Sequence, residues 1–268
     1  NNVELNNVAV AAESGEISFV ENHISKRELF AAMAMQALIP VFRSAESAHR
    51  LMILMDEMGS GKTKQVIDAA LVLFTRSIID KLLVVAPASV RSVWYDDSLG
   101  ELAKHLWEGL PATITEFHSR TREWTHAGIG LPLKICVVNY EFIRSKNRLI
   151  QLLPFCMAKT LLVLDESTAV KSHKAEQTKA CLQIRRACGR VVLLNGTPIA
   201  NSPADMFSQG NIMDPSILAC KSYFHFRARY AIMGGWQQKV IVGWRDLEDL
   251  QRRFNPYSIR RLKKDCLD

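Results

Sequence analysis

Short apolar runs separated by segments of helical length make up the main pattern of this chain. The runs are continuous rather than alternating and are rich in Val, Ile and Leu: LMILM (51–55), LLVVA (82–86), ATITEF (112–117), KICVVNY (134–140), TLLVLD (160–165) and RVVLLN (190–195). Strands that are buried on both faces have this composition, and their alternation with helices is typical of parallel sheets. We therefore predict an α/β fold in which helices cover both faces of a mainly parallel central sheet.

Helical spacing is clearest in residues 62–76, KTKQVIDAALVLFTR, where the apolar positions form one stripe. Upstream, Ser25 stands three residues before Glu28. This capping-box pattern, followed by apolar residues at helical spacing, predicts a further helix over residues 25–42. We expect that helix to pack beside the sheet.

The C-terminal part of the chain has a different pattern and a different charge. After residue 215, Gly234 and Gly235 mark the turn of a small hairpin, and DLEDLQRRF (246–254) predicts a short helix. Residues 182–264 carry 14 Lys plus Arg against 5 Asp plus Glu, whereas the whole chain has a net charge of +7. A basic surface of this kind fits a phosphate-backbone partner, and a simply solvated basic surface is the alternative.

The composition of the 268 residues is ordinary for a globular protein, with 48% hydrophobic and 23% charged residues. No apolar stretch approaches the roughly 20 residues of a membrane span, so we expect no membrane partner. The six cysteines include no C-x-x-C pair, which argues against a zinc site or a disulfide framework. Together with an N-terminus unlike a secretory signal, this favours a cytoplasmic protein with reduced thiols.

The first candidate site is MDEMGSGKT (55–63), which directly follows an apolar run. A strand, a glycine-rich turn, and Lys-Thr at a helix start form a triphosphate site, because backbone N–H groups and the positive helix end face the anion. Lys62 would reach the terminal phosphates, and the Thr63 hydroxyl would coordinate Mg²⁺. Asp56 stands where the general pattern has its first glycine. The predicted nucleotide-binding residues are Asp56, Glu57, Met58, Gly59, Ser60, Gly61, Lys62, Thr63 and Lys64.

A second acidic motif, LLVLDEST (161–168), follows a later apolar run. Such a phosphate loop needs a carboxylate at the end of a nearby strand to hold Mg²⁺ and orient water. We assign Asp165 to the metal together with Thr63, and Glu166 to the base that polarises water, so that Lys62, Asp165 and Glu166 are the predicted catalytic residues. Thr197, in the turn after the next run, presents a hydroxyl that can sense the γ-phosphate; an ordinary loop is the alternative.

Together these stretches resemble the N-terminal RecA-like lobe of the Swi/Snf group of superfamily 2 helicase-like ATPases, which are double-stranded-DNA translocases. The resemblance extends over about residues 45–268 and leaves residues 1–44 as an extension with a helix packed on the lobe. The compact motif spacing favours a bacterial or phage source, and hence a bacterial or virus-infected cell. The matching stretches are DEMGSGKT (56–63) with Gln65, VVAPASVRSVW (84–94), VVNYEFIR (137–144), DESTAVKSHKA (165–175), LNGTPIANSPADMF (194–207) and YSIRRLKKD (257–265).

The resemblance implies ATP and Mg²⁺ as cofactors and a second RecA-like lobe, absent from this chain, that completes the ATP hydrolase. It implies that the lobe binds the backbone of double-stranded DNA without sequence preference. The matching DNA-contact candidates are Ser89, Arg91, Tyr140 and Arg144, although solvated helix charges are the alternative for the two arginines. We expect Trp94 and Trp124 to be packing residues.

Three further assignments come from the same resemblance. Gln36 matches the position of an adenine-contacting glutamine, with an ordinary helix-surface glutamine as the alternative. Thr168 stands where the family usually has His, so the coupling between Thr168 and Thr197 would use a hydroxyl. The basic residues of the last stretch are expected at an interlobe hinge or on DNA, with a solvated linker as the alternative; they are Arg260, Arg261, Lys263 and Lys264.

The sequence thus leaves three functions open. The main hypothesis is the ATP-binding lobe of a DNA translocase used in remodelling, repair or replication. The second is the motor lobe of a restriction or phage recombination system. The third is a nucleotide-dependent clamp that binds ATP and DNA without translocating, which the absence of the usual His at position 168 favours.

Overall fold

The computed structural model describes residues 51–96, 98–116, 132–196 and 202–261. In these residues seven parallel strands form one sheet, in the order β3-β4-β2-β5-β6-β1-β9. The strands are β1 (Leu51–Leu54), β2 (Lys81–Ala86), β3 (Ala112–Glu116), β4 (Leu133–Asn139), β5 (Thr160–Leu164), β6 (Arg190–Leu194) and β9 (Ser258–Ile259). This is the α/β fold predicted from the apolar runs.

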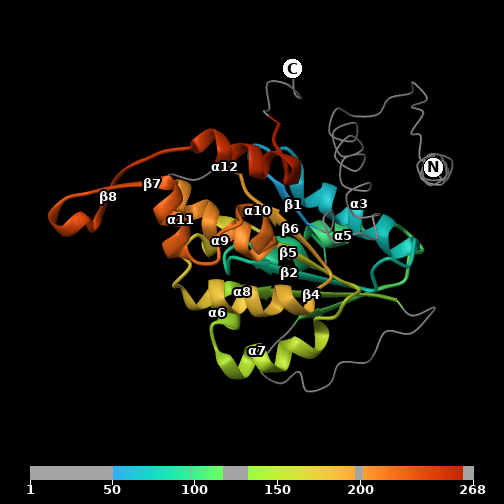
Figure 1. Ribbon diagram of the computed structural model, residues 1–268. Coiled ribbons are helices and arrows are strands. Elements are labelled where there is room, and N and C mark those ends of the chain that lie inside the picture. Colours follow the sequence, from blue (N-terminus) through green and yellow to red (C-terminus); the bar gives the residue numbers. More distant parts are fainter. Residues whose placement is uncertain (1–50, 97, 117–131, 197–201, 262–268) are drawn as a thin grey trace, which may run out of the picture.

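Helices cover both faces of the sheet (Figure 1). Successive strand residues point to opposite faces, so Leu51 and Ile53 join one hydrophobic cluster while Met52 and Leu54 join the other. The second cluster is covered by α3 (Lys62–Thr75), α4 (Arg91–Tyr95) and α5 (Glu101–His105). The first is covered by α6 (Tyr140–Ile143), α7 (Lys146–Leu152), α8 (Glu176–Ala187), α9 (Pro203–Met213), α10 (Pro215–Leu218), α11 (Tyr223–Tyr230) and α12 (Leu247–Phe254).

The predicted elements correspond closely to the observed ones. Each apolar run forms a strand whose ends lie within one residue of the prediction, and residues 62–75 form α3. Gly234 and Gly235 lie at the turn between β7 (Ala231–Gly234) and β8 (Val240–Trp244), which pair as an antiparallel hairpin. The helix predicted at 246–254 is α12, whereas the helix predicted at 25–42 lies outside the described residues.

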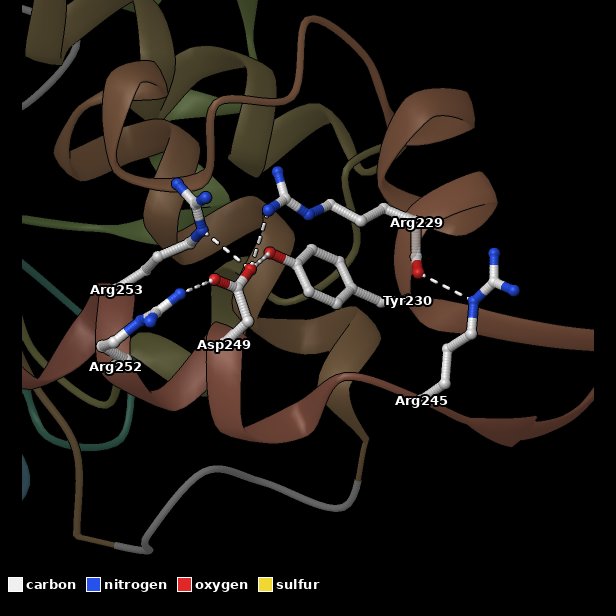
Figure 2. A network of polar contacts seen from close by, with 6 residues as sticks. All are labelled: Arg229, Tyr230, Arg245, Asp249, Arg252 and Arg253. Atoms are coloured by element: carbon white, nitrogen blue, oxygen red, sulfur yellow. Dashed lines mark hydrogen bonds and ion pairs between the residues drawn. The ribbon is translucent and has the colours of Figure 1, made fainter.

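The hairpin extends away from the sheet and is fastened at its base by polar contacts (Figure 2). Asp249 on α12 accepts hydrogen bonds from the side chains of four residues. The bonds from Arg253, Tyr230 and Arg252 hold the pKa of its carboxyl far below the usual range. Arg245 at the end of β8 donates to the backbone carbonyl of Arg229 at 2.9 Å. The donors to Asp249 are Arg229 (2.9 Å), Tyr230 (2.8 Å), Arg252 (2.6 Å) and Arg253 (2.9 Å).

Across the described ranges, no helix is both long enough and apolar enough to cross a membrane.

Candidate nucleotide-binding site

The loop between β1 and α3 has the backbone conformation of an anion cradle. Gly59 and Gly61 both have φ of +79°, in the left-handed region where a side chain would be strained. Gly61 is the N-cap of α3, and no side chain caps the helix or places a carboxylate in its first turn. The first N–H groups of a helix have no partner within the helix, so this end fits a phosphate.

Two polar side chains of the loop show what it can hold. Lys62 Nζ donates to the backbone carbonyls of Asp56 at 2.8 Å and of Glu57 at 2.9 Å, which places the ammonium inside the loop. The hydroxyl oxygen of Ser60 is buried and makes no hydrogen bond with the described residues. A buried hydroxyl without a partner is costly, and a phosphate oxygen would satisfy it. The residues of the loop therefore fit a nucleotide.

Asp165 follows β5 and is held at four atoms. Its backbone N–H donates to Val85 at 2.8 Å, and its backbone carbonyl accepts from the Tyr140 hydroxyl at 2.8 Å. One carboxylate oxygen accepts from the Trp94 indole at 2.8 Å, and the other accepts from the Glu166 N–H at 2.9 Å. A carboxylate can accept about four hydrogen bonds or metal bonds, so acceptor capacity remains for Mg²⁺.

Glu166 lies beside Asp165 in an unusual backbone conformation. Its φ of 45° and ψ of 58° are left-handed, which costs a non-glycine residue about 1–3 kcal/mol and is often found at functional sites. Burial first, and the Asp165 carboxylate second, raise the pKa of Glu166, and Lys62 opposes this shift. Burial likewise raises the pKa of Asp165, and the charge of Lys62 again opposes it. A raised pKa makes Glu166 a stronger base when it is ionised.

The loops after β1 and β5 carry these residues, and they meet the turn after β6 at one edge of the sheet. Strands β1, β6 and β5 are neighbours, and in a parallel sheet their carboxyl ends share an edge. A Cβ added to Gly196, just after β6, would lie 2.6 Å from Met58 Cγ and 3.8 Å from the carboxylate of Glu166. The charge of Lys62 also acts on Asp165 and Glu166. The predicted catalytic residues are therefore brought together.

Asp56 has a structural position that the sequence did not indicate. Its side chain is fully buried, and burial raises its pKa, while the nearby charge of Arg261 and the Gln65 amide lower it. Arg261 comes from the segment after β9, whose backbone pairs with the start of the loop: Met55 N–H donates to Ile259 at 2.7 Å, and Glu57 N–H to Arg261 at 3.3 Å. Ser258 and Ile259 thus form an edge strand of the sheet, and Arg261 lies against the loop, whereas Arg260 is exposed.

For several other predicted site residues, the structure shows only their exposure or a local contact. Lys64 forms an ion pair with Asp68 at 2.6 Å, and Met58 is 66% exposed over the turn after β6. Thr63 is half-buried in the first turn of α3. The Thr168 hydroxyl is 3.5 Å from the carbonyl of Glu166, within its own motif. Four further predicted residues lie outside the described residues: Gln36, Thr197, Lys263 and Lys264.

The candidate DNA contacts lie in the segments that follow strands β2 and β4. Ser89, after β2, and Arg144, at the end of α6 after β4, are exposed, while Arg91 is half-buried and stacks on the Tyr95 ring with 5.4 Å to its centroid. Because β4, β2 and β5 run parallel, the segments that follow them begin at the same sheet edge as Asp165.

Two aromatic residues form hydrogen bonds that the sequence did not predict. The proposed DNA contact of Tyr140 is wrong in this structure, because its side chain is 3% exposed and its hydroxyl bonds to Asp165. Trp94 is 1% exposed, which confirms that it is a packing residue, but its hydrogen bond to Asp165 was not foreseen. The two partners are 71 residues apart, and no local pattern marks such a pair. Trp124 lies outside the described part of the chain.

Comparison with known proteins agrees with this geometry. Residues 35–268 match the family model described as SNF2-related domain. The chain is 30% identical over 218 residues to the DNA annealing helicase and endonuclease ZRANB3 of Bos taurus, which covers 79% of this chain and 19% of that protein. It is 29% identical over 221 residues to the chromatin-remodeling ATPase INO80 of Gibberella zeae, covering 79% of this chain and 11% of that protein.

Among solved structures, the Sulfolobus solfataricus SWI2/SNF2 ATPase core in complex with dsDNA has the same fold, with a TM-score of 0.64 and 22% identity over 90% of this chain and 45% of that one. The relatives named here are eukaryotic and archaeal, so a bacterial or phage source stays a prediction. The family match covers most of the chain and includes every motif that meets at the loop edge. This chain belongs to the SNF2-related domain family.

Proposed function

We propose that this chain is the ATP-binding lobe of a DNA-dependent ATPase that translocates along double-stranded DNA. The observation that carries the proposal is the meeting of Lys62, Asp165 and Glu166 beside an uncapped helix N-terminus. Phosphoryl transfer needs mainly positioning and charge stabilisation, and these residues supply both.

Each residue has a defined role in this proposal. Lys62 leaves the backbone carbonyls of its loop to bind the terminal phosphates of ATP, and the first N–H groups of α3 bind the adjacent oxygens. Thr63 and Asp165 would hold Mg²⁺, which neutralises phosphate charge when bound. Glu166 orients the attacking water and accepts its proton. The bonds from Trp94 and Glu166 N–H keep the Asp165 carboxylate turned toward the loop edge.

DNA is the proposed second ligand. The printed names of the relatives include a DNA annealing helicase and a chromatin-remodeling ATPase, and the archaeal structure is a complex with dsDNA. In this chain, Ser89, Arg91 and Arg144 lie at the sheet edge beside the nucleotide loops. Their side chains fit phosphate contacts, which predict salt-dependent binding without sequence preference.

We further propose that hydrolysis requires a second RecA-like lobe. The chain spans 45% of the archaeal ATPase core and smaller shares of the named relatives. Arginine fingers from a second lobe would contribute about 10³–10⁵ in rate. This lobe alone is then expected to bind nucleotide weakly and to hydrolyse it slowly. A nucleotide-dependent clamp remains the second candidate, because the Thr168 hydroxyl contacts only its own motif among the contacts described.

The test is ATP hydrolysis by the full-length protein, with and without duplex DNA. We expect DNA-stimulated turnover that Lys62→Ala abolishes and that Glu166→Gln lowers by about 10²–10⁴-fold. The matched controls are Lys179→Ala and Glu176→Gln, because these residues form an exposed ion pair on α8 at 2.6 Å. Both controls should retain wild-type turnover.

Translocation separates the two candidates. A motor displaces a triplex-forming strand from duplex DNA in an ATP-dependent manner, whereas a clamp binds DNA and nucleotide without displacing it. Stimulated turnover that survives Glu166→Gln would contradict the role of Glu166, and an absence of nucleotide binding would contradict the proposal itself.

A further inference from the structure

Two short helices each combine a DNA-contact candidate with a buried aromatic residue that bonds to Asp165. Helix α4 carries Arg91 and Trp94, and α6 carries Tyr140 and ends at Arg144. The helices follow β2 and β4, the strands that lie between the sheet's far edge strand β3 and β5. Each helix thus joins a candidate phosphate contact to Asp165 through one aromatic donor.

One side of α4 faces solvent, and the other side faces the candidate nucleotide site. Ser92 and Val93 are exposed, whereas Trp94 is buried in the hydrophobic cluster that also holds Leu102 and Val137. The Trp94 indole reaches Asp165 with a hydrogen bond of 2.8 Å. Because α4 has only five residues, about one and a half turns, a displacement on its exposed side also displaces Trp94.

On α6, the start of the helix is fixed and its end is exposed. The Asn139 side chain accepts a hydrogen bond from Phe142 N–H at 2.7 Å, which caps the helix. Tyr140, the first helical residue, donates to the backbone carbonyl of Asp165 at 2.8 Å. Arg144 is the C-cap and is exposed. A force on Arg144 therefore acts on a helix that is joined to Asp165 at its other end.

Both bonds end on Asp165, the residue that would hold Mg²⁺ in the proposed function. Trp94 bonds to the carboxylate, and Tyr140 bonds to the main chain of the same residue. Packed interiors transmit small displacements because they contain few voids, and hydrogen bonds weaken steeply as their angle departs from linearity. A change at either helix thus changes how well Asp165 is aligned for Mg²⁺.

We propose that Trp94 and Tyr140 are positioning residues that couple DNA contact at α4 and α6 to the binding of magnesium and nucleotide at Asp165. The proposal rests on the proposed function. Linkage requires the coupling to be reciprocal, so nucleotide changes DNA affinity by the same factor by which DNA changes nucleotide affinity. Neither aromatic residue touches DNA or nucleotide; each acts through Asp165.

The test measures equilibrium binding of a fluorescent, non-hydrolysable ATP analogue to the full-length protein, with Mg²⁺ or EDTA and with or without duplex DNA. In the wild type we expect Mg²⁺ to strengthen nucleotide binding and DNA to change it by about 5–150-fold. Tyr140→Phe removes the hydroxyl donor and keeps the ring. Trp94→Phe removes the indole N–H donor but replaces the indole with a smaller phenyl ring. We expect the DNA effect to fall below about twofold in Trp94→Phe and to shrink in Tyr140→Phe, with DNA affinity in EDTA unchanged.

The matched control is Trp107→Phe, because Trp107 packs against the same cluster as Trp94. It should retain the full coupling. If Trp94→Phe does not fold, benzothienylalanine at position 94 keeps the shape of the side chain without the N–H donor. Full coupling in both variants, or a wild type that binds both ligands without coupling, would overturn this inference alone. A wild type that binds no nucleotide would instead overturn the proposed function.

Discussion

At the scale of single residues, burial determines the chemistry of the acidic pair. Burial raises the pKa of both Asp165 and Glu166, and Lys62 offsets part of the effect. A carboxyl with a raised folded-state pKa keeps its proton at pH values where the unfolded chain has lost it. The stability that Glu166 contributes therefore falls as pH rises from its ordinary pKa of 4.5 through the folded value. In the nucleotide-free protein, ionisation of Glu166 therefore lowers the stability of the folded state.

Glu166→Gln should remove that pH dependence. We expect the thermal midpoint of the variant to match the wild type below pH 4.5, where Glu166 is protonated in both states, and to rise above it as the pH passes through the folded pKa. Scanning calorimetry of both proteins without nucleotide measures the difference. Glu176→Gln is a control of opposite sign, because Lys179 lowers the pKa of Glu176 and stabilises the wild type as pH rises. A constant difference across the pH range for Glu166→Gln would contradict the account.

Sequence predicted the identity of the central residues but not what holds them. Lys62, Asp165 and Glu166 lie in short strand–turn patterns, and such patterns can be recognised in a single sequence. The contacts of Trp94 and Tyr140 with Asp165 join residues that are 71 and 25 positions apart. No local sequence pattern marks such a contact. From the sequence, an aromatic residue that forms a hydrogen bond therefore could not be distinguished from one that only packs.

At the scale of elements, the apolar runs predicted which segments form strands but not how the strands pair. Strand β1 lies between β6 and β9, and neither is its neighbour along the chain. Parallel pairing is non-local, so the order cannot be derived from runs alone. Strand β9 was missed because its pairing involves only two residues, Ser258 and Ile259. It nevertheless brings Arg261 to Asp56 beside the nucleotide loop.

The contact between β9 and the loop can be tested by a double-mutant cycle on Asp56 and Arg261. Arg261→Ala removes the cation that lowers the pKa of the buried Asp56, so we expect it to destabilise the protein by about 1 kcal/mol. In the Asp56→Asn background, the same change should cost much less. Urea unfolding of the four proteins measures the coupling. Equal costs in both backgrounds would show that the two side chains do not interact.

At the scale of the whole molecule, the residues proposed for the two ligands lie along one sheet edge. Loops after β1 and β5 carry the candidate nucleotide residues, and the segments after β2 and β4 carry the DNA candidates. The two groups meet at Asp165, which bonds to residues from both sides. A division of this kind allows ATP turnover to depend on DNA without any shared contact residue.

Salt dependence tests the DNA side of this edge. Each phosphate contact that is lost should reduce the slope of log affinity against log salt by about 1, so Arg91→Ala and Arg144→Ala should each have this effect. Arg186→Ala is the control, because Arg186 is exposed near the end of α8, which leads to the start of β6 at the opposite edge. Fluorescence anisotropy with duplexes of different sequence gives the slopes. Unchanged slopes for both edge variants would place the DNA elsewhere.

The most direct measurement is an experimental structure of the full-length protein with Mg²⁺ and a non-hydrolysable ATP analogue. We predict the terminal phosphates at Lys62 and the N-terminus of α3, the metal bound by Thr63 and Asp165, and the Trp94 indole still bonded to the Asp165 carboxylate. A nucleotide bound at another edge of the sheet, or a metal that Asp165 does not contact, would contradict the account.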